Sequence, residues 1–154
     1  VLRALPRLKV NLKDYEARKL ISEASLLSGI SISQTKTAIC HSISYPLTAK
    51  YGIEHGIACA FTMLAVSKKV NLYEKNCFLN ILNEIGLTSS DSLILKIKDI
   101  VSIFKIKEHV LDKLSNKDEL NELIDEITSY GRSDNFILPV DHNLIRDIIE
   151  DSFR

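Results

Sequence analysis

The sequence predicts a single all-α domain, folded as a helical bundle. Apolar residues recur at helical spacing along most of the 154-residue chain, and no segment alternates between apolar and polar residues for long. Only five Gly and three Pro are present, which argues against long loops and a turn-rich all-β architecture. The length fits one domain with a sizeable core.

The first part of the chain is expected to hold an extended lead-in and one helix. Residues 1–11 combine Pro6 with mixed charge, which favours an irregular conformation. Asp14 stands at an N-cap position, because residues at helical spacing follow it: Ala17, Leu20, Ile21, Ala24 and Leu27. We expect this helix to end near Gly29.

Two helices joined by a tight turn are expected next. The first begins at residues 33–35, and one of its sides carries Ile39, Ile43 and Leu47. Because proline removes a backbone donor, Pro46 predicts a kink or break around residues 42–46. Residues 50–52 form a turn, and a helix follows over residues 54–70. Since that helix is apolar nearly all round, it should be central and buried.

The rest of the chain also predicts helices, without repeats or low-complexity tracts. One helix runs over residues 74–85 and ends at Gly86, a favourable C-cap. Residues 88–91 supply caps for the next helix, whose apolar residues are Leu93, Ile97, Ile100, Val101 and Phe104. Shorter helices are expected near residues 107–114, 117–129 and 141–152.

The charge balance excludes some classes of partner. Lys plus Arg and Asp plus Glu both number 20, so the formal net charge is zero. Because no basic cluster stands out, we expect neither a nucleic acid nor an anionic membrane as partner. The longest nearly continuous apolar run, residues 57–66, is about half a membrane span, and no signal sequence opens the chain.

The cysteines predict a reducing, cytoplasmic location. Cys40, Cys59 and Cys77 form an odd-numbered set without CxxC spacing. Long-lived disulfides and a cysteine zinc site are therefore not expected. Two of the three lie in apolar stretches, where a small buried thiol is the ordinary interpretation.

Two of the four histidines are candidate metal ligands. Thr37, His41 and Tyr45 are spaced four residues apart and share one helix face, while His55 begins the next helix. A helical hairpin can bring both imidazoles to one point, and neutral imidazole suits divalent iron and zinc. Two histidines make only half a site, since a catalytic metal usually has at least three protein ligands and an open position for substrate. His109 and His142 are interpreted as ordinary hydrogen-bonded or surface residues.

The hairpin resembles the signature of the iron-containing (group III) alcohol dehydrogenases. Residues 41–60 hold a His, a hydrophobic helix turn, Pro46-Leu47, a short turn and a His-Gly-x-Ala-x-Ala motif that begins at His55. The first and last histidines of the family stretch are metal ligands, and they match His41 and His55 with the same separation. Weaker similarity covers the rest of the chain, at residues 14–18, 23–25, 131–135 and 147–149.

The resemblance implies that residues 1–154 are the all-helical, metal-binding C-terminal domain of a longer enzyme. The family takes an Asp and a His ligand, and its whole nucleotide-binding domain, from sequence that would precede this chain. No glycine-rich strand–turn–helix pattern occurs in these residues, and Val1 also hints at an earlier start. Tyr45 stands where many members have a His, as in the branch resembling phosphonoacetaldehyde reductases, which residues 35–37 and 48–52 also resemble.

The chemistry implied by the resemblance is hydride transfer between NAD or NADP and a small aldehyde or alcohol, beside Fe²⁺ or Zn²⁺. His41 and His55 would hold the metal, and Tyr45 would pass a proton or pack against the nicotinamide. The isolated chain is expected to be inactive. Its partner would be the missing nucleotide-binding domain, and an apolar face left uncovered where that domain docks could drive homo-oligomer formation.

Two other functions stay open at this point. One is a dehydroquinate synthase-like lyase domain, which also uses NAD and a histidine-bound metal; its usual Gly-His-Thr stretch and longer gap before the last His-Gly are not found here. The other is a non-catalytic helical interaction module in which His41 and His55 are merely packed. The sequence does not choose iron over zinc, NAD over NADP, a substrate or an oligomeric state.

Overall fold

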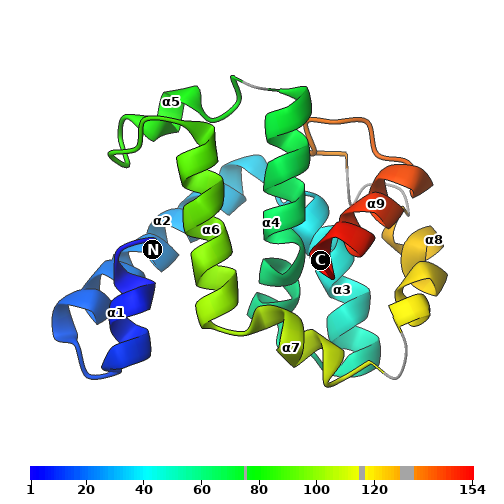
Figure 1. Ribbon diagram of the computed structural model, residues 1–154, viewed down its shortest axis with the longest axis horizontal. Coiled ribbons are helices and arrows are strands. Elements are labelled where there is room, and N and C mark those ends of the chain that lie inside the picture. The colour runs from blue at the N-terminus through cyan, green and yellow to red at the C-terminus, as the bar shows by residue number, and fades with distance from the viewer. Residues whose placement is uncertain (75, 115–116, 129–133) are drawn as a thin grey trace.

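The computed structural model of the chain describes residues 1–74, 76–114, 117–128 and 134–154. All regular structure in these ranges is helical, which confirms the predicted all-α class (Figure 1). The elements are α1 (Ala4–Val10), α2 (Tyr15–Thr35), α3 (Ile39–Tyr51), α4 (His55–Tyr73), α5 (Leu79–Leu82), α6 (Ser90–Ile103), α7 (Ile106–Leu111), the 3-10 helix η1 (Lys117–Leu123), α8 (Ile124–Ile127) and α9 (His142–Ser152).

Helix α4 is the centre of the fold. It packs against α3, α6, α7 and α9, and Figure 1 shows it running between α6 on one side and α3 and α9 on the other. Phe61 of α4 is buried and meets the ring of Phe153 edge-on, with 5.0 Å between ring centroids. Lys69 forms a 2.8 Å ion pair with Asp147 of α9. The predicted central, buried helix is therefore confirmed.

Helices α3 and α4 form the expected hairpin, but α3 begins at Ile39 and not at the predicted residues 33–35, which end α2; Thr37 therefore precedes the helix. Ile39, Ile43 and Leu47 are almost fully buried, so the apolar side of α3 lies in the core as predicted. The predicted break at residues 42–46 is wrong, because α3 is continuous and contains Pro46 as a buried residue. Burial of Ile43, Pro46 and Leu47 outweighs the single backbone hydrogen bond that a proline removes.

The hairpin turn depends on Gly52. This residue caps α3 with φ +63° and ψ +26°, and its N–H donates to the carbonyl of Thr48 at 3.1 Å. That left-handed conformation carries no steric cost for glycine. Ile53, the next residue, is buried and anchors the return of the chain toward α4.

The predictions for the first 35 residues are partly wrong. The expected extended lead-in forms α1, in which Pro6 is the third residue; the first turn of a helix needs no N–H at that position. Asp14 is the N-cap of α2 as predicted, since its carboxylate accepts the N–H of Ala17 at 3.0 Å. However, α2 continues past Gly29 to Thr35, because one internal glycine costs a helix only about 1 kcal/mol.

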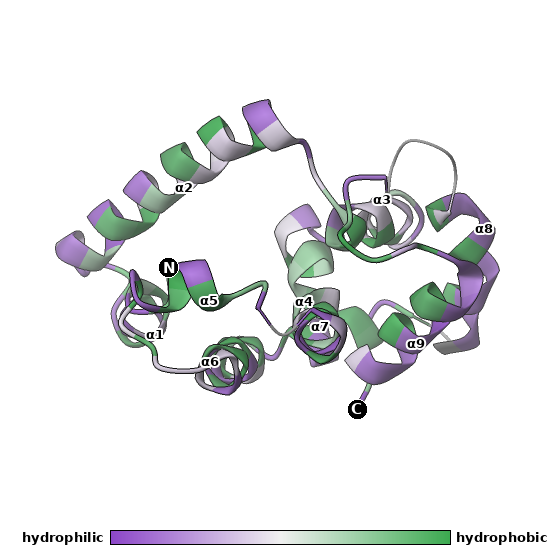
Figure 2. Ribbon diagram, turned by 90° about the horizontal axis from the view of Figure 1, so that it is seen from above, coloured by the Kyte–Doolittle hydropathy of each residue, from purple (hydrophilic) through white to green (hydrophobic). Residues whose placement is uncertain are grey.

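Helix α2 stands away from the rest of the molecule (Figure 2). Its main packing partner among the described elements is α1, and only Ala17 of its side chains is buried. Five large aliphatic side chains of this helix are exposed: Leu20, Leu26, Leu27, Ile30 and Ile32. The described part of the chain therefore leaves much of the apolar surface of α2 uncovered.

The later helices are mostly shorter than predicted. The expected helix 74–85 is reduced to α5, and the expected helix 117–129 divides into η1 and α8; residues 75 and 129 lie outside the described ranges. The cap predicted within residues 88–91 is confirmed, because Ser89 is the N-cap of α6 and forms a reciprocal capping box with Ser92. Asp141, predicted only as the start of the last helix, is the N-cap of α9 and accepts the N–H of Leu144. Among the described residues, no helix combines the length and apolarity needed to cross a membrane.

Replacing Gly52 should test the turn. An added Cβ at Gly52 meets no atom within 4 Å, so Gly52→Ala acts through backbone strain and should lower the free energy of unfolding by about 1–2 kcal/mol. Gly29→Ala is the matched control: it also meets no atom within 4 Å, but lies inside α2 and should stabilise by up to about 1 kcal/mol. Urea unfolding measures both. Equal stability of the two variants would contradict the assigned role of Gly52.

Candidate metal centre

The return of the chain after α3 decides where His55 lies. His41 is in the first turn of α3, and His55 is the first residue of α4. An ordinary antiparallel hairpin would place these two positions at opposite ends. Here residues 52–54 run back along α3 before α4 begins, and each extended residue spans up to about 3.5 Å. His55 therefore lies beside the middle of α3 and within reach of His41.

Three aromatic side chains meet at this point. The ring centroids of His41 and His55 are 5.3 Å apart with a tilt of 60°, and the ring of Tyr45 stacks on His55 at 5.9 Å and 20°. The structure therefore brings together all three residues that were predicted from the sequence. Their roles as metal ligands and catalytic residue remain predictions.

Ser44 fixes the orientation of the His55 ring. Its hydroxyl is buried and donates to the carbonyl oxygen of His41 at 2.8 Å. With its proton engaged there, the same oxygen can only accept a hydrogen bond from Nδ1 of His55, at 3.3 Å. The proton of His55 is thereby assigned to Nδ1, and the lone pair to Nε2. A ligating histidine normally has its second nitrogen held in this way.

Cys59 lies one helical turn beyond His55 and completes a cluster. Its Sγ is 3.7 Å from Nε2 of His55. One ligand atom each from His41, His55 and Cys59 lies within 4.8 Å of the other two. Neither Ser44 nor Cys59 is among the residues predicted from the sequence. The four-residue spacing of His55 and Cys59 on one helix is a signal that could have found Cys59, since such residues share a face.

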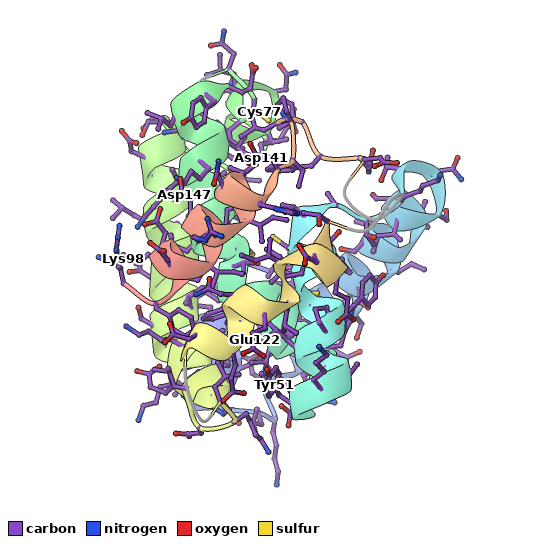
Figure 3. All side chains as sticks on the ribbon, turned by 90° about the vertical axis from the view of Figure 1, so that its right-hand side faces the viewer. Tyr51, Cys77, Lys98, Glu122, Asp141 and Asp147 are labelled. Atoms are coloured by element: carbon purple, nitrogen blue, oxygen red, sulfur yellow. The ribbon has the colours of Figure 1, made fainter. Side chains whose placement is uncertain are left out.

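The other two cysteines lie in different surroundings. Cys40 is next to His41 in sequence but is outside the cluster, and loss of solvent around its thiol raises its pKa to about 11. Cys77 is exposed between α4 and α5, at the opposite end of the molecule from Tyr51 (Figure 3). Burial also raises the pKa of Cys59, and a hydrogen bond with Ser44 opposes that effect.

The surroundings of His41 favour its neutral imidazole form. Partial burial lowers the pKa of His41 first, and repulsion by a positive charge on His55 lowers it further. A neutral ring offers a lone pair, which is the form that binds divalent metals. Two such nitrogens from helices that share a core fit a metal site of the kind that the sequence predicts.

The cluster borders an open cavity of about 990 Å³. Tyr45, Thr48 and His55 form one wall, and residues 34–37, between α2 and α3, form another. Asn135 also lines the cavity, and its amide donates to the carbonyl oxygen of Thr35 at 2.5 Å. A small molecule can therefore reach Tyr45 and His55 from solvent. Residues 131–133 of the similarity noted at 131–135 lie outside the described residues.

The remaining histidines take no part in the cluster. His109 Nδ1 donates to the carbonyl oxygen of Lys105 at 2.9 Å. His142 lies 3.2 Å from the hydroxyl of Thr128 and 3.4 Å from Asp125. Both side chains are exposed, which agrees with their interpretation as surface residues.

Comparisons with known proteins point to one family. Residues 1–152 match the family described as "Fe-containing alcohol dehydrogenase family, C-terminal". The chain is 40% identical over 60 residues to a phosphonoacetaldehyde reductase of Streptomyces viridochromogenes, a match that covers 39% of this chain and 15% of that protein. It is 29% identical over 73 residues to an NAD-dependent methanol dehydrogenase of Bacillus methanolicus, covering 42% and 19%. No solved structure matches. The matches thus span less than a fifth of each curated relative.

Removing the Ser44 hydroxyl should release the His55 ring. Ser44→Ala is expected to mix the two neutral tautomers of His55 and to lower the free energy of unfolding by about 1 kcal/mol, the usual worth of one hydrogen bond. Nitrogen chemical shifts of the imidazoles, measured by NMR, report the tautomer. His109, whose Nδ1 bonds to Lys105, is the internal reference. An unchanged His55 spectrum in the variant would overturn the assignment.

Proposed function

Because the chain belongs to the iron-containing alcohol dehydrogenase family, we propose that it is the metal-binding part of an NAD(P)-dependent oxidoreductase that interconverts a small alcohol and an aldehyde. The observation that carries the proposal is the meeting of His41 and His55, at 5.3 Å between ring centroids, on two helices that share a core. The names of the two curated relatives, a reductase and a dehydrogenase, support the reaction type.

The proposed chemistry divides between the bound groups and this chain. When bound, a divalent iron or zinc ion would polarise the substrate oxygen and the nicotinamide would exchange a hydride with the carbon. His41 and His55 would hold the ion through neutral ring nitrogens, and Ser44 would keep Nε2 of His55 turned toward it. The further ligands and the nucleotide-binding domain expected from the resemblance would come from a separate part of the enzyme.

Tyr45 would form the substrate-side wall of the site. It lies against His55, is 41% exposed and lines the cavity, so its ring can contact a substrate or the nicotinamide. Its hydroxyl can donate a hydrogen bond to an alkoxide oxygen that forms beside the metal. Ring contact and hydrogen bonding by the hydroxyl both depend on the stacking of Tyr45 against His55.

The choice of substrate is testable with two aldehydes. The Streptomyces relative is named for phosphonoacetaldehyde, which is anionic, whereas the Bacillus relative is named for methanol, which is neutral. The cavity is lined by Lys36, which can bind an anionic group, and by Glu126 and Asp134, which would repel one. Oxidation of NADH and NADPH with phosphonoacetaldehyde and with acetaldehyde, by the full-length product of the gene that encodes this chain, would separate the two classes.

Removing a proposed ligand should abolish metal binding in that full-length enzyme. Loss of a group that merely orients a ligand costs about 10–100-fold in affinity or activity, so His55→Ala should cost at least as much. His142→Ala is the matched control, since His142 is exposed and outside the cluster. Metal content and NAD(P)H oxidation are the measurements. A metal-loaded, active His55→Ala enzyme would rule out the assignment.

Two variants separate the roles of Tyr45. If ring packing dominates, Tyr45→Phe retains activity within a few-fold while Tyr45→Ala loses it, because phenylalanine keeps the stack on His55. If the hydroxyl donates to the forming alkoxide, Tyr45→Phe loses about 10²-fold or more in kcat. Steady-state kinetics with saturating cofactor decides between them. Full activity of Tyr45→Ala would remove Tyr45 from the site altogether.

A further inference from the structure

The thiol of Cys59 lies where a metal bound to His55 would need another ligand. Nε2 of His55 carries the free lone pair, and Sγ of Cys59 is the side-chain atom 3.7 Å from it. The resemblance predicts only His41 and His55 as ligands from these residues. We propose that Cys59 is a third ligand from this chain, so that His41, His55 and Cys59 together bind a thiophilic divalent ion such as zinc. This inference rests on the proposed metal site.

The distance between the two atoms fits a shared ion. Zinc binds histidine nitrogen at about 2.0–2.1 Å and cysteine sulfur at about 2.3 Å, in tetrahedral geometry. Those bond lengths and a tetrahedral angle place the nitrogen and the sulfur roughly 3.6 Å apart. The observed separation is 3.7 Å. An ion between them would therefore require almost no movement of α4.

The third donor is also within range. The ligand atoms of all three residues lie within 4.8 Å of one another, and small rotations of the half-exposed His41 ring can shorten its distances. His55 and Cys59 belong to one continuous helix, and His41 belongs to a helix packed directly on it. The donor set is therefore held by backbone that the core already fixes.

A thiolate changes which metal the site prefers. Sulfur is a softer donor than a carboxylate, so a His₂Cys set favours zinc or cobalt over magnesium, calcium or manganese. When the metal–sulfur bond forms, the sulfur–hydrogen bond breaks and the proton passes to solvent. In the isolated chain, three protein ligands leave the fourth position of a tetrahedral ion to water. In the full-length enzyme, a ligand from the separate part would take that position.

Cobalt(II) and zinc titrations of the 154-residue chain test the proposal. The wild-type chain should show thiolate-to-cobalt charge-transfer absorption, and Cys59→Ser should lose it and bind zinc at least ~10-fold more weakly in a chelator competition. Cys40→Ala is the matched control, because Cys40 lies beside His41 in sequence but outside the cluster; it should retain both signals. Circular dichroism confirms that each variant is folded.

A replacement ligand distinguishes coordination from packing. Cys59→His places an imidazole four residues after His55, a spacing that can hold zinc, so it should restore zinc affinity without the charge-transfer band. If Cys59 only fills space, the larger ring should not improve on serine, which would overturn the proposal.

The remaining outcomes separate this inference from the proposed function. Unchanged zinc affinity in Cys59→Ser, with affinity lost in His55→Ala, would overturn the role of Cys59 and leave the histidine pair intact. A wild-type chain that binds neither cobalt nor zinc would overturn the three-ligand site. In that case metal in the full-length enzyme, lost on His55→Ala, would still support the proposed function.

Discussion

The left-handed turn at Gly52, followed by a short extended return, is the constraint on which the candidate site depends. It sets the start of α4 beside the middle of α3. If α4 began directly at the end of α3, His55 would lie beyond Tyr51 and several turns from His41. The core then holds this arrangement, since Ile43 and Leu47 of α3 and Phe61 of α4 belong to one buried cluster. The backbone geometry of the turn determines where His55 lies relative to His41, and core packing holds the two helices in that position.

The polar contacts of the site follow from the same arrangement. Ser44 is buried because it faces α4, and a buried hydroxyl needs partners for both its proton and its lone pairs. It finds them in the carbonyl oxygen of His41 and the ring of His55. One small side chain thus satisfies its own hydrogen-bonding requirement and selects the tautomer of a neighbour. Hydrogen bonding and packing therefore agree on a single orientation of the His55 ring.

Features set by nearby residues could be predicted from the sequence, whereas features set by packing could not. The N-cap at Asp14 and the cap expected within residues 88–91, which is Ser89, depend on residues three positions away and were predicted correctly. The helix end predicted at Gly29 was wrong, because one internal glycine costs a helix little. The break predicted before Pro46 was wrong, because the burial of α3 outweighs the cost of one proline. Similarly, His41 and His55 were found from spacing and resemblance, but the contacts of Ser44 and Cys59 exist only once α3 and α4 pack. The hydrogen bond from Asn135 to Thr35 joins residues that no local pattern connects.

The candidate site thus has two walls, one held in place by core packing and the other by exposed hydrogen bonds. His41 and His55 lie on α3 and α4, whose shared core allows little relative movement. The opposite wall consists of the α2–α3 link and of Asn135, which are exposed and joined by side-chain-to-backbone hydrogen bonds. Such contacts tolerate substitution more readily than core packing does. The side chain of Cys59 lies outside the buried cluster, so its replacement should leave the packing of the hairpin intact.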